Sequence, residues 1–367
     1  MSKKDTEENQ DRHLSDEILR ALAGWFAENK RDLPWRRTRD PYPVWVSEIM
    51  LQQTRIETVL PYYDRFLRTL PGVSDLAACD EEKLLKLWEG LGYYSRVRNM
   101  LKCARVVCEE HGGKFPEGEK ELKSLPGIGP YTAGAIASIC FDRPYPAVDG
   151  NVLRVLSRLY DDHADVMQQP VRRRAETLMR SSLERARELS IRTGDITQGI
   201  MELGETICLA NTVPACSECP LQDECLARER GTAAALPVRV VKTRRRAEER
   251  TVLIITDGEK ILLHRRDQKG LLAGLYELPA LDGEAGVPQI EEAFRKQKTE
   301  VLSAEKVTDA KHLFSHLEWR MQGWRVRVTP DSLSRLASQE NYVAALREEV
   351  TDTYPLPSAF AAFRPYL

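Results

Sequence analysis

The sequence predicts a multidomain protein with an all-α N-terminal part and a smaller α+β C-terminal part. Apolar residues recur at helical spacing through the first part, and we find no convincing strand pattern before residue 230. Beyond it, two apolar runs flank Asp257–Glu259, a turn of the Asp-Gly type that is typical of a β-hairpin. A length of 367 residues is enough for two cores. We expect domains at 1–230 and 249–367, joined by a basic linker at 231–248.

The composition narrows the class of protein. With 42% hydrophobic residues, 30% charged residues and a formal net charge of −2, the chain lacks a uniformly basic coat for nucleic acid, although local basic patches remain compatible with it. The first residues are polar, and no apolar run approaches the roughly 18 residues of a membrane helix. We therefore expect a cytoplasmic protein with no membrane partner. In that compartment the eight cysteines do not predict a disulfide framework.

The first helices carry a basic, aromatic segment and an unusual glutamate. Ser15 caps a helix whose apolar residues run from Ile18 to Phe26. The segment Lys30–Pro43 is either a surface loop or a groove that takes a phosphate backbone or an unstacked base. A second helix is expected over Val44–Thr58. Glu48 lies there among apolar residues, where desolvation would raise its pKa and suit a general acid, although an exposed helical glutamate is commoner.

The stretch that follows pairs a glycine hairpin with an aspartate. Pro126–Pro130 reads PGIGP between two helical patterns, which predicts a helix-hairpin-helix within 119–141 that grips DNA backbone without reading sequence. Asp149, in the tetrapeptide VDGN, either caps the next helix or takes part in the chemistry, and the two roles are compatible. If Glu48 and Asp149 meet, one protonated and one ionised carboxyl would suit cleavage of a glycosidic bond.

Four cysteines form a candidate metal site in the loop 208–225, with the spacing C-x7-C-x2-C-x5-C and no histidine between them: Cys208, Cys216, Cys219 and Cys225. Four thiolates hold either zinc or an iron–sulfur cluster. Zinc ribbons usually have two CxxC pairs and this loop has one, so the spacing favours a [4Fe–4S] cluster. The C-terminal part adds strand patterns over 252–256, 260–264 and 324–328, and a helix pattern over 291–298.

Taken together, the motifs LPGIGPYT, VDGN, WVSEIMLQQT and GLGYYSR and the cysteine cluster resemble the MutY-type adenine DNA glycosylases of the endonuclease III-like, helix-hairpin-helix superfamily. The resemblance implies an all-α glycosylase domain with an iron–sulfur cluster and a C-terminal Nudix-like domain. It also implies a monofunctional, monomeric enzyme that removes adenine paired with 8-oxoguanine, or with guanine, from double-stranded DNA in base excision repair. The base would be flipped out of the duplex.

The same resemblance implies roles for individual residues. Glu48 would protonate adenine at N7, Asp149 would stabilise the sugar cation, and Tyr131 and Asn151 would orient this pair. The adenine pocket would comprise Arg31, Trp35, Arg36, Leu51, Ile56 and Gln198. The residues that wedge into the duplex, hold its backbone or contact 8-oxoguanine would be Gln53, Thr54, Leu91, Tyr93, Gly127, Gly129, Phe314, Ser315 and His316. Glycosylase-lyases carry a lysine where this chain has Tyr131, and a phenol cannot form a Schiff base.

Two departures and two rival functions remain. The first cysteine gap has seven residues where the family usually has six, and the C-terminal part lacks the acidic REx2EE helix that would bind magnesium. One rival is another endonuclease III-like glycosylase, acting on a G/T mismatch or an oxidised pyrimidine. The other is a non-catalytic iron–sulfur protein that binds DNA as a redox sensor, which the presence of both Glu48 and Asp149 disfavours.

Overall fold

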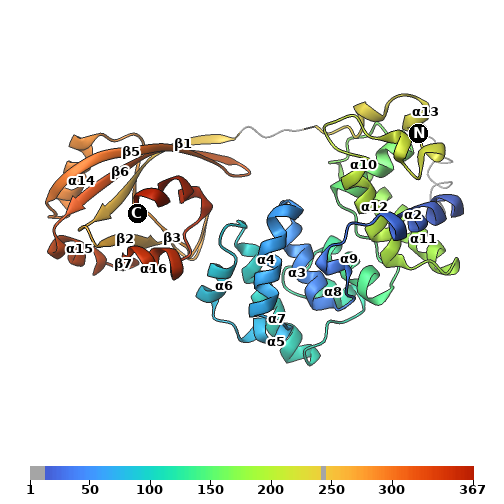
Figure 1. Cartoon of the computed structure of the whole chain (residues 1–367), viewed down its shortest axis with the longest axis horizontal. Helices are drawn as coiled ribbons and strands as arrows, with labels where there is room; N and C mark the ends of the chain where they lie inside the picture. The colour runs from blue at the N-terminus through green and yellow to red at the C-terminus, as the bar shows by residue number, and fades with distance from the viewer. Residues whose placement is uncertain (1–12, 241–244) are drawn as a thin grey trace. The chain divides into compact units, whose positions relative to one another are not determined.

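The computed structural model describes residues 13–240 and 245–367, which form two compact units (Figure 1). Unit 1 contains residues 1–77 and 102–241 and is helical where it is described. Unit 2 contains residues 78–101 and 242–367 and holds every strand of the described chain. The expected order, helical first and mixed second, is therefore confirmed. The boundaries at 230 and 248 stay predictions; strand β1 begins at Arg246, inside the expected linker.

The helices of unit 1 are short to medium in length and are joined by brief loops. They are α2 (Asp16–Asn29), η1 (Pro34–Arg36), α3 (Pro41–Leu51), α4 (Ile56–Thr69), α5 (Val73–Ala78), α8 (Glu119–Ser124), α9 (Pro130–Phe141), α10 (Gly150–Leu159), α11 (Gln169–Glu188), α12 (Thr193–Thr206), η2 (Cys216–Glu218), η3 (Gln222–Glu224), α13 (Leu226–Glu229) and η4 (Ala233–Ala235). Helix α7 (Ser95–His111) runs across the division between the units at residue 101.

The first helix forms as expected. The Ser15 hydroxyl accepts a hydrogen bond from the backbone N–H of Ile18 at 3.2 Å, so it caps α2. The apolar face of α2 is buried against α10, α11 and α12, which share one hydrophobic core. This core fixes α12 beside the start of α10, and the two helices bring their polar ends to the same place.

The expectation of one helix over 44–58 is wrong. Helix α3 ends at Leu51 and α4 begins at Ile56, so a four-residue loop separates them. Within it Gln53 has a φ of 59°, in the left-handed region that non-glycine residues seldom adopt. The apolar spacing continues through this loop, which is why periodicity alone did not reveal the break. The break exposes Gln53 and lets Leu51 and Ile56 face one cavity.

The helix-hairpin-helix is confirmed as α8, a short turn and α9. Gly127 in the turn has a φ of 76°, which requires glycine, and Pro130 occupies the first turn of α9. Further along α9, a Cβ built on Gly134 would lie 2.0 Å from the carbonyl oxygen of Pro146. The segment leading to Asp149 therefore packs directly on the backbone of α9. Gly134 thus sets the path of the chain into the VDGN tetrapeptide.

Unit 2 is built on a seven-stranded sheet in the order β3-β2-β1-β6-β5, with β4 paired to β1 and β7 paired to β2. Strands β1 and β6 run parallel over eleven residue pairs, and the other pairs are antiparallel. Its elements are α6 (Glu81–Leu87), β1 (Arg246–Thr256), β2 (Lys260–Arg265), β3 (Tyr276–Glu277), β4 (Ala280–Asp282), α14 (Val287–Lys296), β5 (Val301–Leu313), β6 (Leu317–Val328), α15 (Pro330–Ala337), β7 (Tyr342–Leu346), α16 (Arg347–Asp352) and η5 (Ser358–Tyr366).

Each face of this sheet has its own core. Successive residues of β1 point to opposite faces, so Val252 belongs to one core and Leu253 to the other. One face is covered by α14 and α15, and the other by α16 and η5. The predicted β1–β2 hairpin and the 324–328 strand are confirmed. The expected helix at 291–298 begins earlier, as α14, at Val287.

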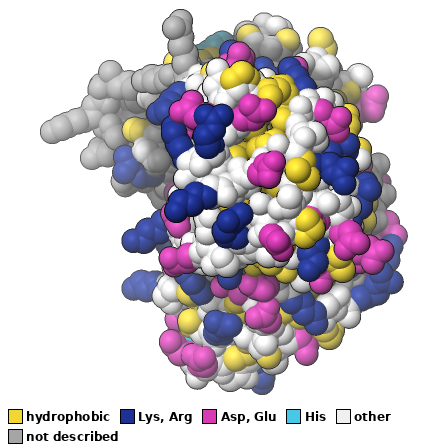
Figure 2. All heavy atoms as spheres, turned by 90° about the vertical axis from the view of Figure 1, so that its left-hand side faces the viewer, with side chains coloured by type: hydrophobic (Ala, Val, Ile, Leu, Met, Phe, Trp, Pro, Cys, Tyr) yellow, Lys and Arg dark blue, Asp and Glu magenta, His cyan; other side chains and the backbone are white. Residues whose placement is uncertain are grey.

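The surface charge is mixed. On the face that Figure 2 shows, basic and acidic side chains are both spread over the described atoms, among uncharged ones. Unit 2 contributes ion pairs such as Arg325 with Glu305 and Lys306 with Asp309. This pattern agrees with the formal net charge of −2. Among the described helices, none is long and apolar enough to cross a bilayer.

Candidate active site

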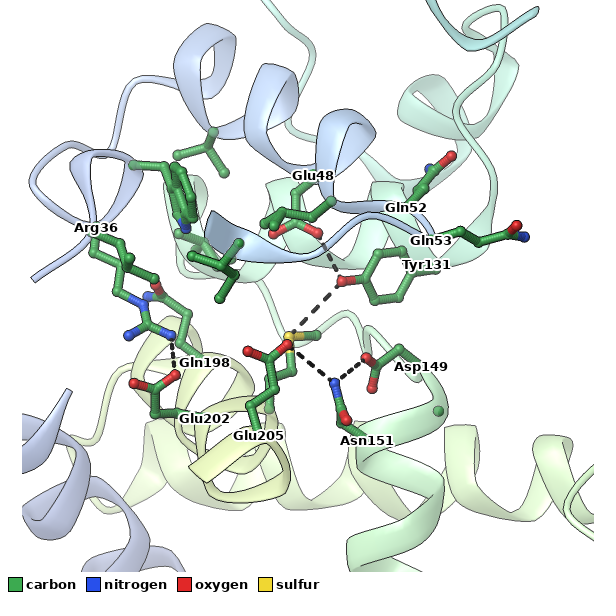
Figure 3. A pocket seen from close by; sticks show the side chains of 18 residues that line it. Arg36, Glu48, Gln52, Gln53, Tyr131, Asp149, Asn151, Gln198, Glu202 and Glu205 are labelled. Atoms are coloured by element: carbon green, nitrogen blue, oxygen red, sulfur yellow. Dashed lines mark hydrogen bonds and ion pairs between the residues drawn. The ribbon is translucent and has the colours of Figure 1, made fainter. Parts of the chain in front are cut away.

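A cavity of about 500 Å³ in unit 1 gathers ten of the predicted site residues (Figure 3). It lies between α3, the start of α9, the start of α10 and one side of α12. The ten are Trp35, Arg36, Glu48, Leu51, Gln53, Ile56, Tyr131, Asp149, Asn151 and Gln198. Residues separated by about a hundred positions in sequence, Glu48 and Asp149 among them, thus line one site.

Glu48 has the environment expected of a carboxylic acid held in its neutral form. It lies on α3, is 8% exposed, and its Oε2 accepts a hydrogen bond from the Tyr131 hydroxyl at 2.7 Å. Burial raises its pKa to about 7. The bond from Tyr131 acts in the opposite direction, while the charges of Asp149 and Glu205 raise the pKa further. Glu48 is therefore partly protonated at neutral pH, as expected from its apolar neighbours in the sequence.

Asp149 both caps a helix and faces the cavity. Its Oδ1 accepts a hydrogen bond from the backbone N–H of Val152 at 2.8 Å, which caps α10. Its Oδ2 accepts one from Asn151 Nδ2 at 3.0 Å. Burial raises the pKa of Asp149, and the backbone hydrogen bonds at the start of α10 oppose that rise. Both predicted roles of this residue are therefore geometrically compatible.

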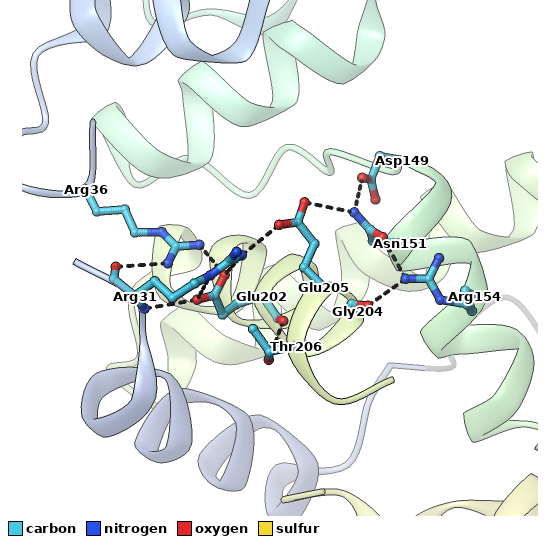
Figure 4. Close-up of polar contacts among 9 residues, drawn as sticks. All are labelled: Arg31, Arg36, Asp149, Asn151, Arg154, Glu202, Gly204, Glu205 and Thr206. Carbon is cyan, nitrogen blue, oxygen red and sulfur yellow. Dashed lines mark hydrogen bonds and ion pairs between the residues drawn. The ribbon is translucent and has the colours of Figure 1, made fainter. Parts of the chain in front are cut away.

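A buried glutamate, paired with two arginines, forms the wall opposite Asp149. Glu202 on α12 accepts hydrogen bonds from Arg31 Nη2 at 2.6 Å and from Arg36 Nη2 at 2.7 Å (Figure 4). Its side chain is fully buried. Although burial works to raise the pKa of Glu202, the two arginines hold it at about 2. Arg31 does not line the cavity itself, but its ion pair with Glu202 places it directly behind a residue that does.

Some of the cavity residues were not among the predicted ones. Met201, Glu202 and Glu205 line it from α12, and Arg154 supports it from α10 by donating to Asn151 Oδ1 at 2.7 Å. Glu202 and Glu205 follow the predicted Gln198 by four and seven positions, so they lie on the same face of the helix. This spacing was the signal in the sequence from which Glu202 and Glu205 could have been found. It becomes informative only once Gln198 is known to face the site.

The remaining predicted residues lie away from the cavity lining. In unit 1, Thr54 is in the α3–α4 loop, and Gly127 and Gly129 form the hairpin. In unit 2, Phe314, Ser315 and His316 form the turn between β5 and β6, and Leu91 and Tyr93 lie between α6 and α7. The Tyr93 hydroxyl and Ser315 Oγ are 3.0 Å apart and share a hydrogen bond. Tyr93 is 49% exposed and has a φ of 47°.

The four predicted cysteine ligands lie near one another, beyond the end of α12. Burial raises the pKa of Cys219 to about 12, and the three other thiols of the set raise it further. Arg158 Nη1 donates to Cys208 Sγ at 3.2 Å. As placed, the described chain contains no group of three or more His, Cys, Asp or Glu side chains that could hold a metal ion. Four cysteine sulfurs are suitable ligands for a four-thiolate site, but their side chains are not arranged around a common point in this structure.

Comparison with protein families agrees with this fold. Residues 46–181 match the sequence model of the HhH-GPD superfamily of base excision DNA repair proteins, and residues 250–364 match that of the NUDIX domain. The solved structure of a thermostable thymine-DNA glycosylase is similar to this chain, with a TM-score of 0.50 and 27% identity. The similarity covers 61% of this chain and 99% of the glycosylase. The class is therefore a helix-hairpin-helix DNA glycosylase with an added Nudix-like domain.

Curated relatives narrow the class. The adenine DNA glycosylase of Rattus norvegicus is 36% identical over 83% of this chain and 69% of its own length. The adenine DNA glycosylase of Homo sapiens is 34% identical over 89% of this chain and 71% of its own length. That of Buchnera aphidicola from Acyrthosiphon pisum is 31% identical over 80% of this chain and 82% of its own length. The chain belongs to the adenine DNA glycosylase family. Its members are glycosidases that act on N-glycosidic bonds.

Proposed function

We propose that this chain is a monofunctional glycosylase that removes adenine paired with 8-oxoguanine, or with guanine, from double-stranded DNA. One observation carries the proposal. A buried glutamate with a pKa of about 7 and an aspartate fixed at a helix N-terminus line the same cavity. Two carboxyl groups held in different environments are the arrangement that glycosidic bond cleavage requires.

Glu48 acts as the general acid. Its proton passes to a ring nitrogen of adenine, which makes the base a neutral leaving group as the bond to C1′ breaks and its electron pair departs with the base. The hydrogen bond from Tyr131 leaves one oxygen of Glu48 free of that contact and orients the carboxyl group. A pKa of about 7 keeps enough of the acid protonated at neutral pH for this step.

Asp149 stabilises the cation that forms on the sugar. The backbone N–H of Val152 and the amide of Asn151 hold its two oxygens, so the carboxylate is pre-oriented before the substrate arrives. Water then adds to C1′ and gives a proton to the Glu48 carboxylate, which completes hydrolysis and restores the acid. The adenine itself is held by Trp35, Leu51, Ile56 and Gln198, with Arg31 and Arg36 fixed beside them by Glu202.

The excision proceeds without a strong lyase activity. A lyase needs an amine that forms a Schiff base with C1′. Among the described residues that line the cavity none is a lysine, and the Tyr131 hydroxyl is engaged with Glu48. Efficient trapping of an enzyme–DNA adduct by borohydride on an abasic product would contradict this part of the proposal.

Several loops carry the residues that we assign to recognition of the base opposite adenine. Gln53 and Thr54 occupy the loop opened by the break between α3 and α4. The exposed Tyr93, next to Leu91, is suited to enter the duplex. Ser315 at the tip of the β5–β6 turn, flanked by Phe314 and His316, offers a hydroxyl for 8-oxoguanine. The C-terminal domain thus serves as a lesion sensor and not as a pyrophosphatase.

We further propose that Cys208, Cys216, Cys219 and Cys225 hold a [4Fe–4S] cluster. When bound, the cluster would crosslink the segment that follows α12, and its iron would balance the negative charge of four partly buried thiolates. Arg158 Nη1 already donates to Cys208 Sγ at 3.2 Å, so a cationic side chain stands beside one of the four sulfurs. The enzyme works as a monomer on duplex DNA in the cytoplasm.

The test is an excision assay on four duplexes that carry A opposite 8-oxoguanine, A opposite G, T opposite G, and thymine glycol, each followed by alkali cleavage. Base loss from the first two alone supports the proposal. Loss from either of the others supports a different endonuclease III-like glycosylase, and binding without base loss supports the redox sensor. Glu48→Gln should lower the single-turnover rate by about 10² to 10⁴, while the exposed Glu184→Gln keeps it unchanged.

A further inference from the structure

Helix α12 brings two further carboxyl groups to the cavity, beside those of Glu48 and Asp149. Glu205 lies in its last turn and lines the cavity together with Gln198 and Glu202 (Figure 3). The two glutamates differ in their surroundings. Glu202 is fully buried and receives hydrogen bonds from two arginines, whereas the Glu205 side chain is 38% exposed. The ion pairs with two arginines give Glu202 a structural role. They do not explain why a second glutamate, Glu205, lines the cavity.

The contacts of Glu205 connect the cavity edge to the catalytic aspartate. Its Oε2 accepts a hydrogen bond from Arg31 Nη2 at 2.7 Å (Figure 4). Its Oε1 lies 3.4 Å from Asn151 Nδ2, which also donates to Asp149 Oδ2 at 3.0 Å. The two N–H groups of this amide thus face two different carboxylates.

The orientation of Asn151 is determined by its other partner. Arg154 Nη2 donates to Asn151 Oδ1 at 2.7 Å, and an arginine cannot accept a hydrogen bond. The amide oxygen therefore faces Arg154, and the nitrogen faces Asp149 and Glu205. With Glu205 removed, one of the two N–H groups loses its carboxylate, and Asn151 keeps its bonds to Arg154 and Asp149 but is held less firmly against Asp149.

We infer that Glu205 is a positioning residue of the catalytic site, which holds Asn151 against Asp149 and links that pair to Arg31. The inference rests on the proposed function, and it assigns to the reaction a third carboxylate in addition to Glu48 and Asp149.

The charge of Glu205 has a second effect, on the general acid. The charged or titratable groups that act on Glu48 come from four elements, and they are Tyr131 of α9, Asp149 at the start of α10, Glu205 of α12 and Arg36 of η1. Tyr131 and Arg36 favour the ionised acid, whereas Asp149 and Glu205 favour the protonated one. Loss of the Glu205 charge therefore lowers the pKa of Glu48, so that the acid loses its proton at lower pH.

The experiment measures single-turnover release of adenine opposite 8-oxoguanine from about pH 5 to about pH 9, on both sides of the pKa of Glu48. Glu205→Gln keeps the shape and a hydrogen-bond acceptor but removes the charge. We expect its alkaline limb to move to lower pH, with rates above pH 7 reduced about three- to tenfold. Glu205→Ala also loses the contact with Asn151, so we expect its plateau rate to fall about tenfold to a hundredfold.

A double-mutant cycle tests whether Glu205 acts on the reaction through Asn151. If Glu205 acts through Asn151, then Glu205→Ala should change the plateau by less than about twofold in an Asn151→Ala background. The exposed Glu184→Gln on α11 removes a charge of the same sign away from the cavity and should match the wild type. Thermal melting of each variant detects loss of folding, and Glu205→Gln is the variant that keeps the shape if Glu205→Ala is unstable.

Two results would overturn the inference. One is a Glu205→Gln profile that coincides with the wild type together with a Glu205→Ala plateau within about twofold of it. The other is full additivity of the Glu205 and Asn151 effects on the plateau. Both presuppose an active wild type, so they are distinct from failure of the proposed function, in which the wild type itself releases no adenine from either duplex.

Discussion

At the residue scale, the protonation of Glu48 determines the working pH. Burial raises its pKa to about 7, and the protonated form is the active acid. The group is fully protonated well below that pH and loses its proton as the pH rises through it. We therefore expect the single-turnover rate to reach a plateau on the acid side of 7 and to fall about tenfold for each pH unit above it. A rate that rises through this range would contradict the acid role.

Tyr131 should shift that profile in the direction opposite to Glu205. Its hydroxyl donates to Glu48 and stabilises the ionised carboxylate, so the bond lowers the pKa of Glu48. Tyr131→Phe removes this bond, and we expect the alkaline limb to move to higher pH. Tyr145→Phe, which removes a hydroxyl outside the cavity lining, is the control. A shift to lower pH in Tyr131→Phe would show that the hydroxyl acts on another group.

The sequence allowed several of these residues to be predicted, but not all. Glu48 was a candidate because it lies among apolar residues of a predicted helix, and the family resemblance then supplied its role. Asp149 could be identified because it precedes a helix pattern at a glycine. Glu205 could not, since its importance depends on Asn151 and Arg31, which lie 54 and 174 positions away in the chain.

At the element scale, the close approach of α12 to α10 depends on a glycine. A Cβ on Gly204 would lie 2.8 Å from Asn151 Cβ, which is too close for two carbon atoms. We expect Gly204→Ala to displace Asn151, to destabilise the protein by about 1–3 kcal/mol and to lower the excision rate about tenfold or more. Urea unfolding and single-turnover kinetics measure the two effects.

The control is Gly24→Ala on α2, where a Cβ would meet nothing within 4 Å. In a helix interior, alanine is favoured over glycine by about 0.5–1 kcal/mol, so this variant should be more stable and fully active. If both variants were equally active, the packing of α12 against Asn151 would have no catalytic importance.

Asp149 makes two contributions, as the N-cap of α10 and as a carboxylate in the cavity, and two substitutions separate them. Asn is also a good N-cap, so Asp149→Asn should keep the stability of the wild type within about 0.5 kcal/mol while losing excision. Asp149→Ala loses the cap as well and should be about 1 kcal/mol less stable. Chemical denaturation of both variants tests this. An active Asp149→Asn variant would show that the carboxylate charge is unnecessary.

Local patterns predicted some elements well and others poorly. The α8–α9 hairpin and the β1–β2 hairpin were predictable because glycine and proline determine their turns. The break between α3 and α4 was not, because it depends on a left-handed glutamine. The parallel pairing of β1 with β6 was also not predictable, since Arg246 and its partner Leu317 are 71 positions apart and no local signal joins them.

At the scale of the whole molecule, the cysteine loop should bind iron. We expect the purified enzyme to contain about four iron atoms per chain, and Cys208→Ala to lose most of them and to melt at a lower temperature. Cys103→Ala, which removes a fully buried thiol outside the set, should also lower the melting temperature but keep its iron. Equal iron contents in the two variants, or zinc in place of iron, would contradict the assignment.

The order of a helical part before a mixed part was predictable, but the partners of residues 78–101 were not. Their helical pattern shows that one face is apolar without showing what covers it. In the structure this segment belongs to unit 2, through contacts such as Arg265 with Glu82 at 3.1 Å and Lys86 with the carbonyl oxygen of Tyr354 at 3.2 Å. Such contacts join side chains far apart in sequence, which no local pattern encodes.

Strand β1 has a mechanical consequence. It is the first element of the described chain beyond residue 244, and it pairs in parallel with β6 over eleven residues, from Arg246 to Thr256. A pull on its N-terminal end acts along the strand, so the load is shared by the whole ladder of hydrogen bonds in shear and is not taken by one bond at a time. The domain is therefore joined to the rest of the chain at a mechanically resistant point of its sheet.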